Sequence, residues 1–256
     1  MKTTRKLTFG FISLVLLGGF LVAGANFWKS SLTVHRVLVH GNSVVQTNEI
    51  LQLAHVNDGA RMYDLDLLKI QKDVVSHYFI KAVLVERDLP STIRIKVTER
   101  APVAMINPGE LRYLDPDGVV LPHSVSGELF DLPLIGGIPP DVSPKVGATL
   151  THSDIQEALT ILSTARLVNK EMFHLISEVR LRNGGDIVLY TAEGSVPVLF
   201  GRGNVASKLV RLETFWNGIV RERGSRLVQY IDVRFDDQVV VRWKDQQGKL
   251  KLLPRS

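Results

Sequence analysis

The sequence contains no cysteine. Disulfide bonds, thiolate metal ligands and a cysteine nucleophile are therefore excluded. If the chain leaves the cytoplasm, its stability must come from the packing of its core. Its 256 residues are enough for one or two domains with cores of their own.

The chain also carries little net charge outside its first 30 residues. The formal net charge is +5 at pH 7, but residues 1–30 hold four cations and no acid, namely Lys2, Arg5, Lys6 and Lys29. The remaining residues carry 27 basic side chains (31 minus 4) against 26 acidic ones. Nucleic-acid binding requires a basic surface aligned with phosphates, so the sequence predicts no nucleic-acid partner.

Motifs for catalysis and metal binding are missing as well. The seven histidines are scattered, and there is no Gly-x-Ser-x-Gly elbow, Ser-x-x-Lys set or P-loop. Asp115 and Asp117 resemble a pair of catalytic carboxylates, but Asp-Pro-Asp-Gly is far more typical of a turn. We therefore predict no catalytic residue, no metal, no cofactor and no small-molecule substrate.

One motif resembles a nucleotide-binding site. Gly201-x-Gly203-x-x-Ala206 lies between a predicted strand and a predicted helix, and Asp232 ends a later strand, as in a dinucleotide-binding fingerprint. Only 24 residues follow Asp232 (256 minus 232), too few for a doubly wound sheet, and Pro197 interrupts the first strand. The sequence favours a glycine turn between a strand and a helix.

Residues 7–28 contain no charged side chain. As a helix they would extend about 33 Å, which matches a hydrocarbon core of about 30 Å. The cations that precede them would hold residues 1–6 in the cytoplasm as a short tail. We predict an uncleaved transmembrane anchor, with the rest of the chain outside the cytoplasm.

A cleaved signal peptide is the alternative to the anchor. Ala23-Gly24-Ala25 resembles a cleavage site after a basic start. The apolar stretch is longer than the roughly 7 to 15 residues of a signal-peptide core, which favours the anchor. Both interpretations export the remaining chain.

Residues 33–100 predict a small domain of order β-α-α-β-β. Thr47 is suited to cap the first helix and Asp64 or Asp66 to cap the second. The last strand places Ile93, Ile95 and Val97 inward, and Arg94 and Lys96 outward. The strands are predicted at residues 33–40, 82–86 and 92–98.

Residues 101–253 are dominated by short strands. A hairpin is predicted around Asp117-Gly118, and two helices are predicted, one from a Ser153 cap to Leu167 and one over residues 204–221. Further strands are expected at residues 132–135, 176–182, 187–191, 196–200, 227–235, 239–243 and 250–253, with Asn183-Gly184-Gly185 joining the second and third. The predicted fold class is α+β: a transmembrane helix, the small first domain, and a strand-rich β domain with two helices.

Several local sequences resemble one known family. The order of residues 33–100, ending in Glu99-Arg100-x-Pro102-Val103-Ala104, resembles a POTRA (polypeptide-transport-associated) domain of the FtsQ/DivIB cell-division family. Residues 230–235, Tyr-Ile-Asp-Val-Arg-Phe, leading into Val241-Arg242-Trp243, resemble that family's second, β domain. Two departures are present: Phe235 stands where tyrosine is common, and Asp236-Asp237-Gln238 lacks the usual turn glycine.

This resemblance implies a non-enzymatic scaffold of the divisome. The expected protein is a single-pass protein of the cell inner membrane, with periplasmic domains, enriched at the septum. Its expected partners are FtsB- or DivIC-like and FtsL-like proteins and other divisome membrane proteins, through which it regulates septal peptidoglycan synthesis.

The resemblance also implies which residues bind the partner. In this family, matching positions of the second domain contact the partner, and a terminal strand with free backbone groups can accept an added strand. The predicted partner-binding residues are Arg234, Phe235, Val239, Val241 and Trp243. A second, weaker surface is expected at an edge of the POTRA-like sheet, formed by Val83, Val85, Glu86, Arg94 and Lys96.

Two other functional classes compete with this interpretation. The first is a POTRA-bearing chaperone or assembly factor for outer-membrane or exported proteins, but such factors carry several POTRA units and a barrel of alternating strands that this sequence lacks. The second is a secreted enzyme, which the missing catalytic motifs disfavour.

Overall fold

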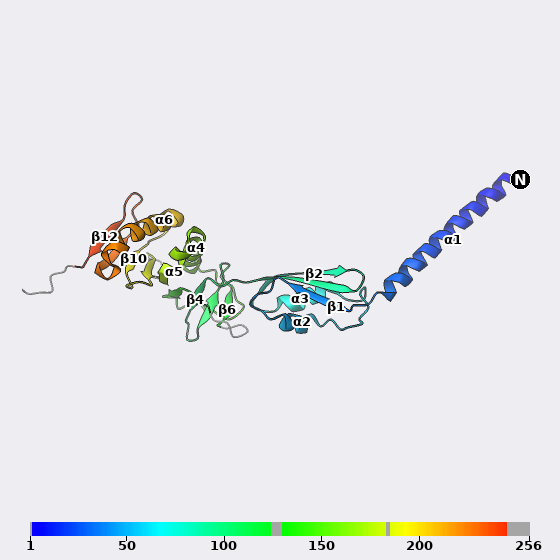
Figure 1. The fold of residues 1–256 in the computed structure, drawn as a ribbon, viewed down its shortest axis with the longest axis horizontal. Helices are drawn as coiled ribbons and strands as arrows, with labels where there is room; N and C mark the ends of the chain where they lie inside the picture. The colour runs from blue at the N-terminus through cyan, green and yellow to red at the C-terminus, as the bar shows by residue number, and fades with distance from the viewer. Residues whose placement is uncertain (1, 124–129, 183–184, 245–256) are drawn as a thin grey trace, which may run out of the picture. The chain divides into compact units, whose positions relative to one another are not determined.

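The computed structural model of the chain describes residues 2–123, 130–182 and 185–244, with side chains from Leu14 onward. Helix α1 (Lys2–Ser31) contains the predicted anchor (Figure 1). Its residues Leu14–Ser31 are long and apolar enough to cross a membrane, and none of them is buried. The rest divides into two compact units between Arg100 and Ala101, each described separately below.

The first unit has the predicted β-α-α-β-β order. It consists of β1 (Arg36–His40), α2 (Thr47–Ala54), α3 (Leu67–Val75), β2 (Ile80–Asp88) and β3 (Thr92–Glu99). Strand β3 lies in the centre of the sheet, parallel to β1 and antiparallel to β2. Ile93, Ile95 and Val97 face the core as predicted, at 0%, 0% and 6% exposed.

The helix caps of this unit were predicted with mixed success. Asp66 caps α3, because its Oδ1 accepts hydrogen bonds from the backbone N–H groups of Leu68 and Lys69 at 3.0 and 3.1 Å. The Thr47 cap is wrong, since the residue at the cap position is Gln46, whose side chain makes no capping hydrogen bond. The Thr47 hydroxyl instead accepts a hydrogen bond from Asn42 at 3.1 Å.

Glu99 has a structural role that explains its place in the closing motif. Its carboxylate accepts hydrogen bonds from the backbone N–H groups of Ser43, Val44 and Val45 and from the Ser43 hydroxyl, at 2.8 to 3.2 Å. Burial alone would raise the pKa of Glu99, but the hydrogen bonds, led by that from Val45, outweigh it and lower the pKa. The carboxylate therefore joins the end of β3 to the loop before α2.

Replacing Glu99 with glutamine is expected to destabilise the first unit by about 1 to 2 kcal/mol, because the amide NH2 cannot accept the hydrogen bonds of the oxygen it replaces. Faster hydrogen exchange at the Val44 and Val45 amides would report this loss. Since the folded pKa is lowered, the wild-type contribution is present above the unfolded value of about 4.3 and is lost as pH falls through the folded value. Glu86→Gln, which changes a half-exposed carboxylate of the same unit, is the control. Equal exchange in both variants would contradict the assignment.

The second unit contains a nine-stranded mixed sheet in the order β12-β11-β10-β9-β8-β7-β4-β5-β6. Strand β10 is parallel to β11, β7 is parallel to both β4 and β8, and the other neighbours are antiparallel. The strands are β4 (Ala104–Ile106), β5 (Arg112–Leu114), β6 (Val120–Pro122), β7 (Leu134–Gly136), β8 (Ile176–Arg180), β9 (Val188–Thr191), β10 (Pro197–Leu199), β11 (Val228–Asp232) and β12 (Val240–Trp243).

Helices and strands of the second unit share one hydrophobic core. Its helices are α4 (Ser153–Val168), α5 (Lys170–Leu175), α6 (Val205–Phe215), a π-helical turn (Trp216–Val220) and α7 (Arg221–Arg223), followed by a 3₁₀ turn (Ser225–Leu227). Leu159 of α4, Leu212 of α6 and Ile231 of β11 belong to the same buried cluster. This core holds the C-terminal end of the sheet in place.

The second unit also departs from the sequence predictions. Helix α5, strand β4 and the π-helical turn were not predicted, and the predicted Ser153 cap is wrong, because His152 occupies the cap position and its Nδ1 accepts from the Asp154 N–H. The Asp117-Gly118 hairpin is confirmed by the antiparallel pairing of β5 and β6. The predicted strand at 250–253 and residues 183–184 of the predicted turn lie outside the described residues.

Candidate partner-binding surface

The two ends of the nine-stranded sheet differ. At the β6 end, Val120 donates a backbone hydrogen bond to Ala148 and accepts one from Gly147, each at 2.8 Å, so the chain covers its own edge. At the other end, β12 pairs with β11 alone, and no other strand of the described chain lies along its outer edge. Among the described residues, the outer edge of β12 therefore has no neighbouring strand, which is the arrangement that strand addition requires.

The side chains of β12 alternate between the core and the surface. Val239, Val241 and Trp243 are half-buried and pack against the core, whereas Val240 and Arg242 are exposed. The guanidinium of Arg223 lies 5.2 Å from the centre of the Trp243 ring. Trp243 is therefore partly a core residue and partly accessible.

Phe235 is placed differently from Trp243. It lies in the connection between β11 and β12, is 46% exposed, and is not among the residues that pack against the core. An exposed phenylalanine in the loop that leads into β12 suits an interface, where aromatic side chains are enriched. Phe235 is therefore not a core residue.

Arg234 takes part in ion pairs within the chain. Its guanidinium contacts Asp232 through Nε at 3.0 Å and Nη2 at 2.6 Å, and Asp186 through Nη1 at 2.6 Å. The hydrogen bond with Arg234 is the main cause that lowers the pKa of the buried Asp232, and hydrogen bonds with Asp232 and then Asp186 raise the pKa of Arg234. Arg234 thus fixes the start of the loop that presents Phe235.

The missing turn glycine does not disturb the β11–β12 connection. Asp232 pairs with Val240, so the connection spans residues 233–239 and is too long to require a tight turn. None of these residues has a positive φ. Asp236 accepts a hydrogen bond from the Asn204 side chain at 3.2 Å, which ties the loop to the start of α6.

The glycine motif at 201–206 forms a turn whose amide is already engaged by the protein. Gly201 and Gly203 have φ values of +68° and +66°, and a Cβ on Gly201 would come within 2.9 Å of the Arg234 side chain. The Gly203 N–H donates to the Glu157 carboxylate at 2.9 Å, where a nucleotide phosphate would otherwise bind. The geometry agrees with a structural glycine turn that also positions Arg234.

The second predicted surface comprises Val83, Val85, Glu86, Arg94 and Lys96. Val83 and Val85 are only 6% and 8% exposed, so their side chains belong to the core. Arg94 and Lys96 lie on β3, the central strand, which corrects the expectation of an edge position for them. Their cations form ion pairs with Asp88 and Glu86 on β2. Only β2 of these two strands is at an edge.

The other polar clusters weighed from the sequence have structural roles. The Asp115 Oδ1 accepts hydrogen bonds from the N–H groups of Asp117 and Val119 at 3.0 and 2.8 Å, as expected of a turn. Within the described ranges, no group of three or more histidine, aspartate or glutamate side chains could hold a metal ion.

Sequence reasoning missed two residues of the surface, Asp186 and Arg223. Both come from parts of the chain remote from β12, so no local pattern identifies them. The Asp232-x-Arg234 spacing did carry a signal, because residues two apart in an extended segment point to the same side and can pair.

Comparisons with known proteins agree on both units. Residues 32–100 match the family described as POTRA domain, FtsQ-type. Residues 104–234 match the family described as cell division protein FtsQ/DivIB, C-terminal. The second match ends at Arg234, immediately before Phe235 and the β12 edge.

Curated relatives match nearly the whole chain. The chain is 31% identical over 250 residues to cell division protein FtsQ of Geotalea daltonii, covering 94% of this chain and 88% of that protein. It is 32% identical over 222 residues to cell division protein FtsQ of Rhodothermus marinus, covering 84% and 79%. It is 29% identical over 233 residues to the protein of the same name of Syntrophotalea carbinolica, covering 90% and 79%.

Proposed function

Because the chain belongs to the FtsQ/DivIB family of bacterial cell-division proteins, we propose that it is a divisome scaffold that recruits FtsB- or DivIC-like and FtsL-like partners by accepting a strand at β12. It is anchored in the inner membrane by α1, with residues 1–6 in the cytoplasm and both units in the periplasm. It performs no catalysis. It acts by holding its partners at the septum, where they regulate peptidoglycan synthesis.

The outer edge of β12, along which no other described strand lies, carries this proposal. Strand addition supplies affinity through backbone hydrogen bonds and specificity through alternate side chains. Val240 and Arg242 project from the exposed face of β12, and Phe235 stands in the adjoining loop. A partner segment with apolar side chains at alternate positions would fit this arrangement.

The absence of cysteine allows a direct test of strand addition. A single cysteine at Val240 or Arg242 is to be paired with cysteines introduced one at a time along the partner segment, and disulfide formation measured in the periplasm. An added strand is expected to crosslink at every second partner position, because successive side chains alternate between faces. A helix packed on the surface would give positions three or four apart and would contradict strand addition. Leu167→Cys on α4 is the control.

The divisome role itself is tested by imaging the full chain fused to a fluorescent protein. We expect a band at the division plane of dividing cells, which neither an outer-membrane assembly factor nor a secreted enzyme requires. An even distribution around the envelope at all stages of division would overturn the proposed role.

A further inference from the structure

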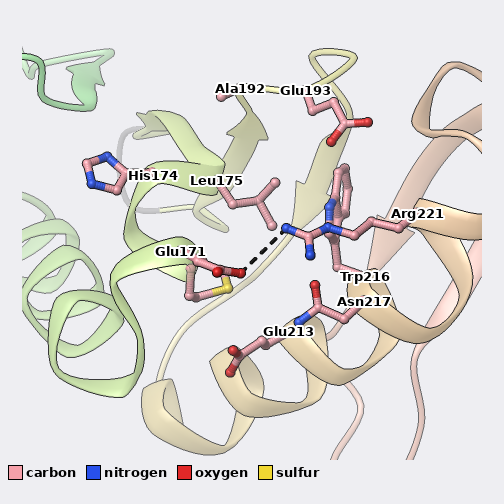
Figure 2. Close-up of a pocket in the computed structure, with 10 residues that line it drawn as sticks. Glu171, His174, Leu175, Ala192, Glu193, Glu213, Trp216, Asn217 and Arg221 are labelled. Carbon is pink, nitrogen blue, oxygen red and sulfur yellow. Dashed lines mark ion pairs between the residues drawn. The ribbon is translucent and has the colours of Figure 1, made fainter.

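A pocket of about 300 Å³ lies between three parts of the chain: α5, the β9–β10 turn, and the segment from the end of α6 through the π-helical turn to the start of α7 (Figure 2). Met172, Leu175 and Trp216 supply its apolar lining. Polar side chains from all three elements surround that lining: Glu171, Glu193, Glu213, Asn217 and Arg221. None of these residues belongs to the β12 surface.

The carboxylates of this pocket are held largely by neutral groups. Glu213 accepts a hydrogen bond from the Asn169 amide at 2.7 Å, and Glu193 accepts one from the Ser225 hydroxyl at 3.2 Å. Glu171 faces Arg221, but their closest atoms are 3.6 Å apart and both side chains are more than half exposed. Three carboxylates and one guanidinium therefore line the pocket, and His174 lies at its margin (Figure 2). The pocket keeps an excess of negative charge.

The π-helical turn brings the lining of the pocket together. The Arg221 N–H donates to the Trp216 carbonyl, five residues earlier. In an α-helix five residues make about 1.4 turns, which would direct the two side chains to different sides. The wider turn lets both Trp216 and Arg221 line the pocket (Figure 2). Such turns interrupt α-helices rarely and often at functional sites.

We propose that this pocket receives a basic side chain, arginine or lysine, from an apolar segment of a partner polypeptide. The long methylene stem of such a residue suits the apolar lining, while its charged end meets carboxylates that neutral donors already orient. Arg221 can keep its contact with Glu171, while Glu193 and Glu213, which lie on opposite sides of the Arg221 guanidinium (Figure 2), are each available to the incoming cation. This site is separate from the β12 edge and does not require strand addition there.

The test uses the full chain in detergent micelles, labelled with 5-fluorotryptophan. The three tryptophan signals in the fluorine NMR spectrum are to be assigned with Trp28→Phe and Trp243→Phe. The probes are acetyl-Leu-Arg-Leu-amide and the same peptide with neutral citrulline in place of arginine. We expect the arginine peptide to shift the Trp216 signal and to bind at least about tenfold more tightly than the citrulline peptide.

Two variants separate this site from other binding modes. The double variant Glu193→Gln and Glu213→Gln keeps the shape of both side chains and one acceptor oxygen on each. It is expected to weaken binding of the arginine peptide about tenfold without lowering the melting temperature of the protein. Phe235→Ala is expected to leave the Trp216 shift unchanged. Equal binding of the two peptides, an unchanged affinity in the glutamine variant, or no shift of the Trp216 signal would each overturn the proposal.

Discussion

Replacement of Phe235 by alanine is expected to weaken partner binding by about 2 kcal/mol, which corresponds to a roughly 30-fold rise in Kd. The ring is 46% exposed in the free protein and does not pack against the core. Its removal should therefore change the free energy of unfolding by less than about 0.5 kcal/mol. Titration of the wild-type and Phe235→Ala chains with the purified FtsB-like partner measures Kd. Thermal unfolding of the same two chains measures the change in the free energy of unfolding.

Two further variants, Leu167→Ala and Trp243→Ala, serve as controls for Phe235→Ala. Leu167 on α4 is 86% exposed, so Leu167→Ala removes an apolar surface side chain without touching β12 and should leave Kd unchanged. Trp243→Ala should lower both affinity and stability, because the ring packs on the core and beneath Arg223. If Phe235→Ala binds the partner as tightly as the wild type, the aromatic anchor proposed for this surface is wrong.

The prediction for Phe235 depends on the position of β12 at the end of the sheet, which the sequence pattern does not reveal. A strand over residues 239–243 was predicted correctly, and in the structure Val239, Val241 and Trp243 share the face that packs on the core, because side chains alternate with a period of two. The sequence pattern could not indicate whether that strand lies inside the sheet or at its end. Strand order depends on contacts between distant segments, such as the parallel pairing of β10 with β11 across helix α6.

The POTRA-like unit illustrates the same limit. Inward and outward residues of β3 were predicted correctly from their alternation, with Ile93 and Ile95 fully buried. Its central position was not, because β1 joins β3 across both helices of the unit. Arg94 and Lys96 therefore form ion pairs with β2 in the middle of the sheet rather than at an edge.

Elements without a strong periodic signal were missed for a different reason. Helix α5 has six residues, too few for a helical repeat to stand out. It follows α4 directly, because Asn169 ends α4 and its side chain accepts from the Glu171 N–H to begin the next helix. The pocket beside α5 could therefore not be predicted from the sequence, because nothing in the sequence indicated that its acidic residues come together.

Arg234 was predicted to bind the partner, and its contacts within the chain give it a further structural role. Asp232 is 5% exposed and relies on Arg234 for two side-chain hydrogen bonds. A buried carboxylate that loses its cation is strongly destabilising, and partial exposure of Arg234, 41% for its side chain, reduces that cost through solvent screening. Loss of partner binding in an Arg234 variant can thus arise from a displaced loop as well as from a lost contact.

Arg234→Ala is accordingly expected to destabilise the second unit by about 2 to 3 kcal/mol near neutral pH. Asp186→Ala removes only the half-exposed partner of the same guanidinium and should cost less than about 1 kcal/mol.

The pH dependence of stability shows whether Arg234 acts through the charge of Asp232 or through packing. In the wild type the lowered pKa of Asp232 gives stability that is present above the unfolded value of about 3.9 and is lost as pH falls through the folded value. Without Arg234, burial raises the pKa of Asp232, so acidification toward about pH 4 should relieve the destabilisation instead. Thermal unfolding from pH 7 down to pH 4 measures the difference between the two proteins. A constant difference would mean that Arg234 supports the loop through its packing against Gly201 rather than through the charge of Asp232.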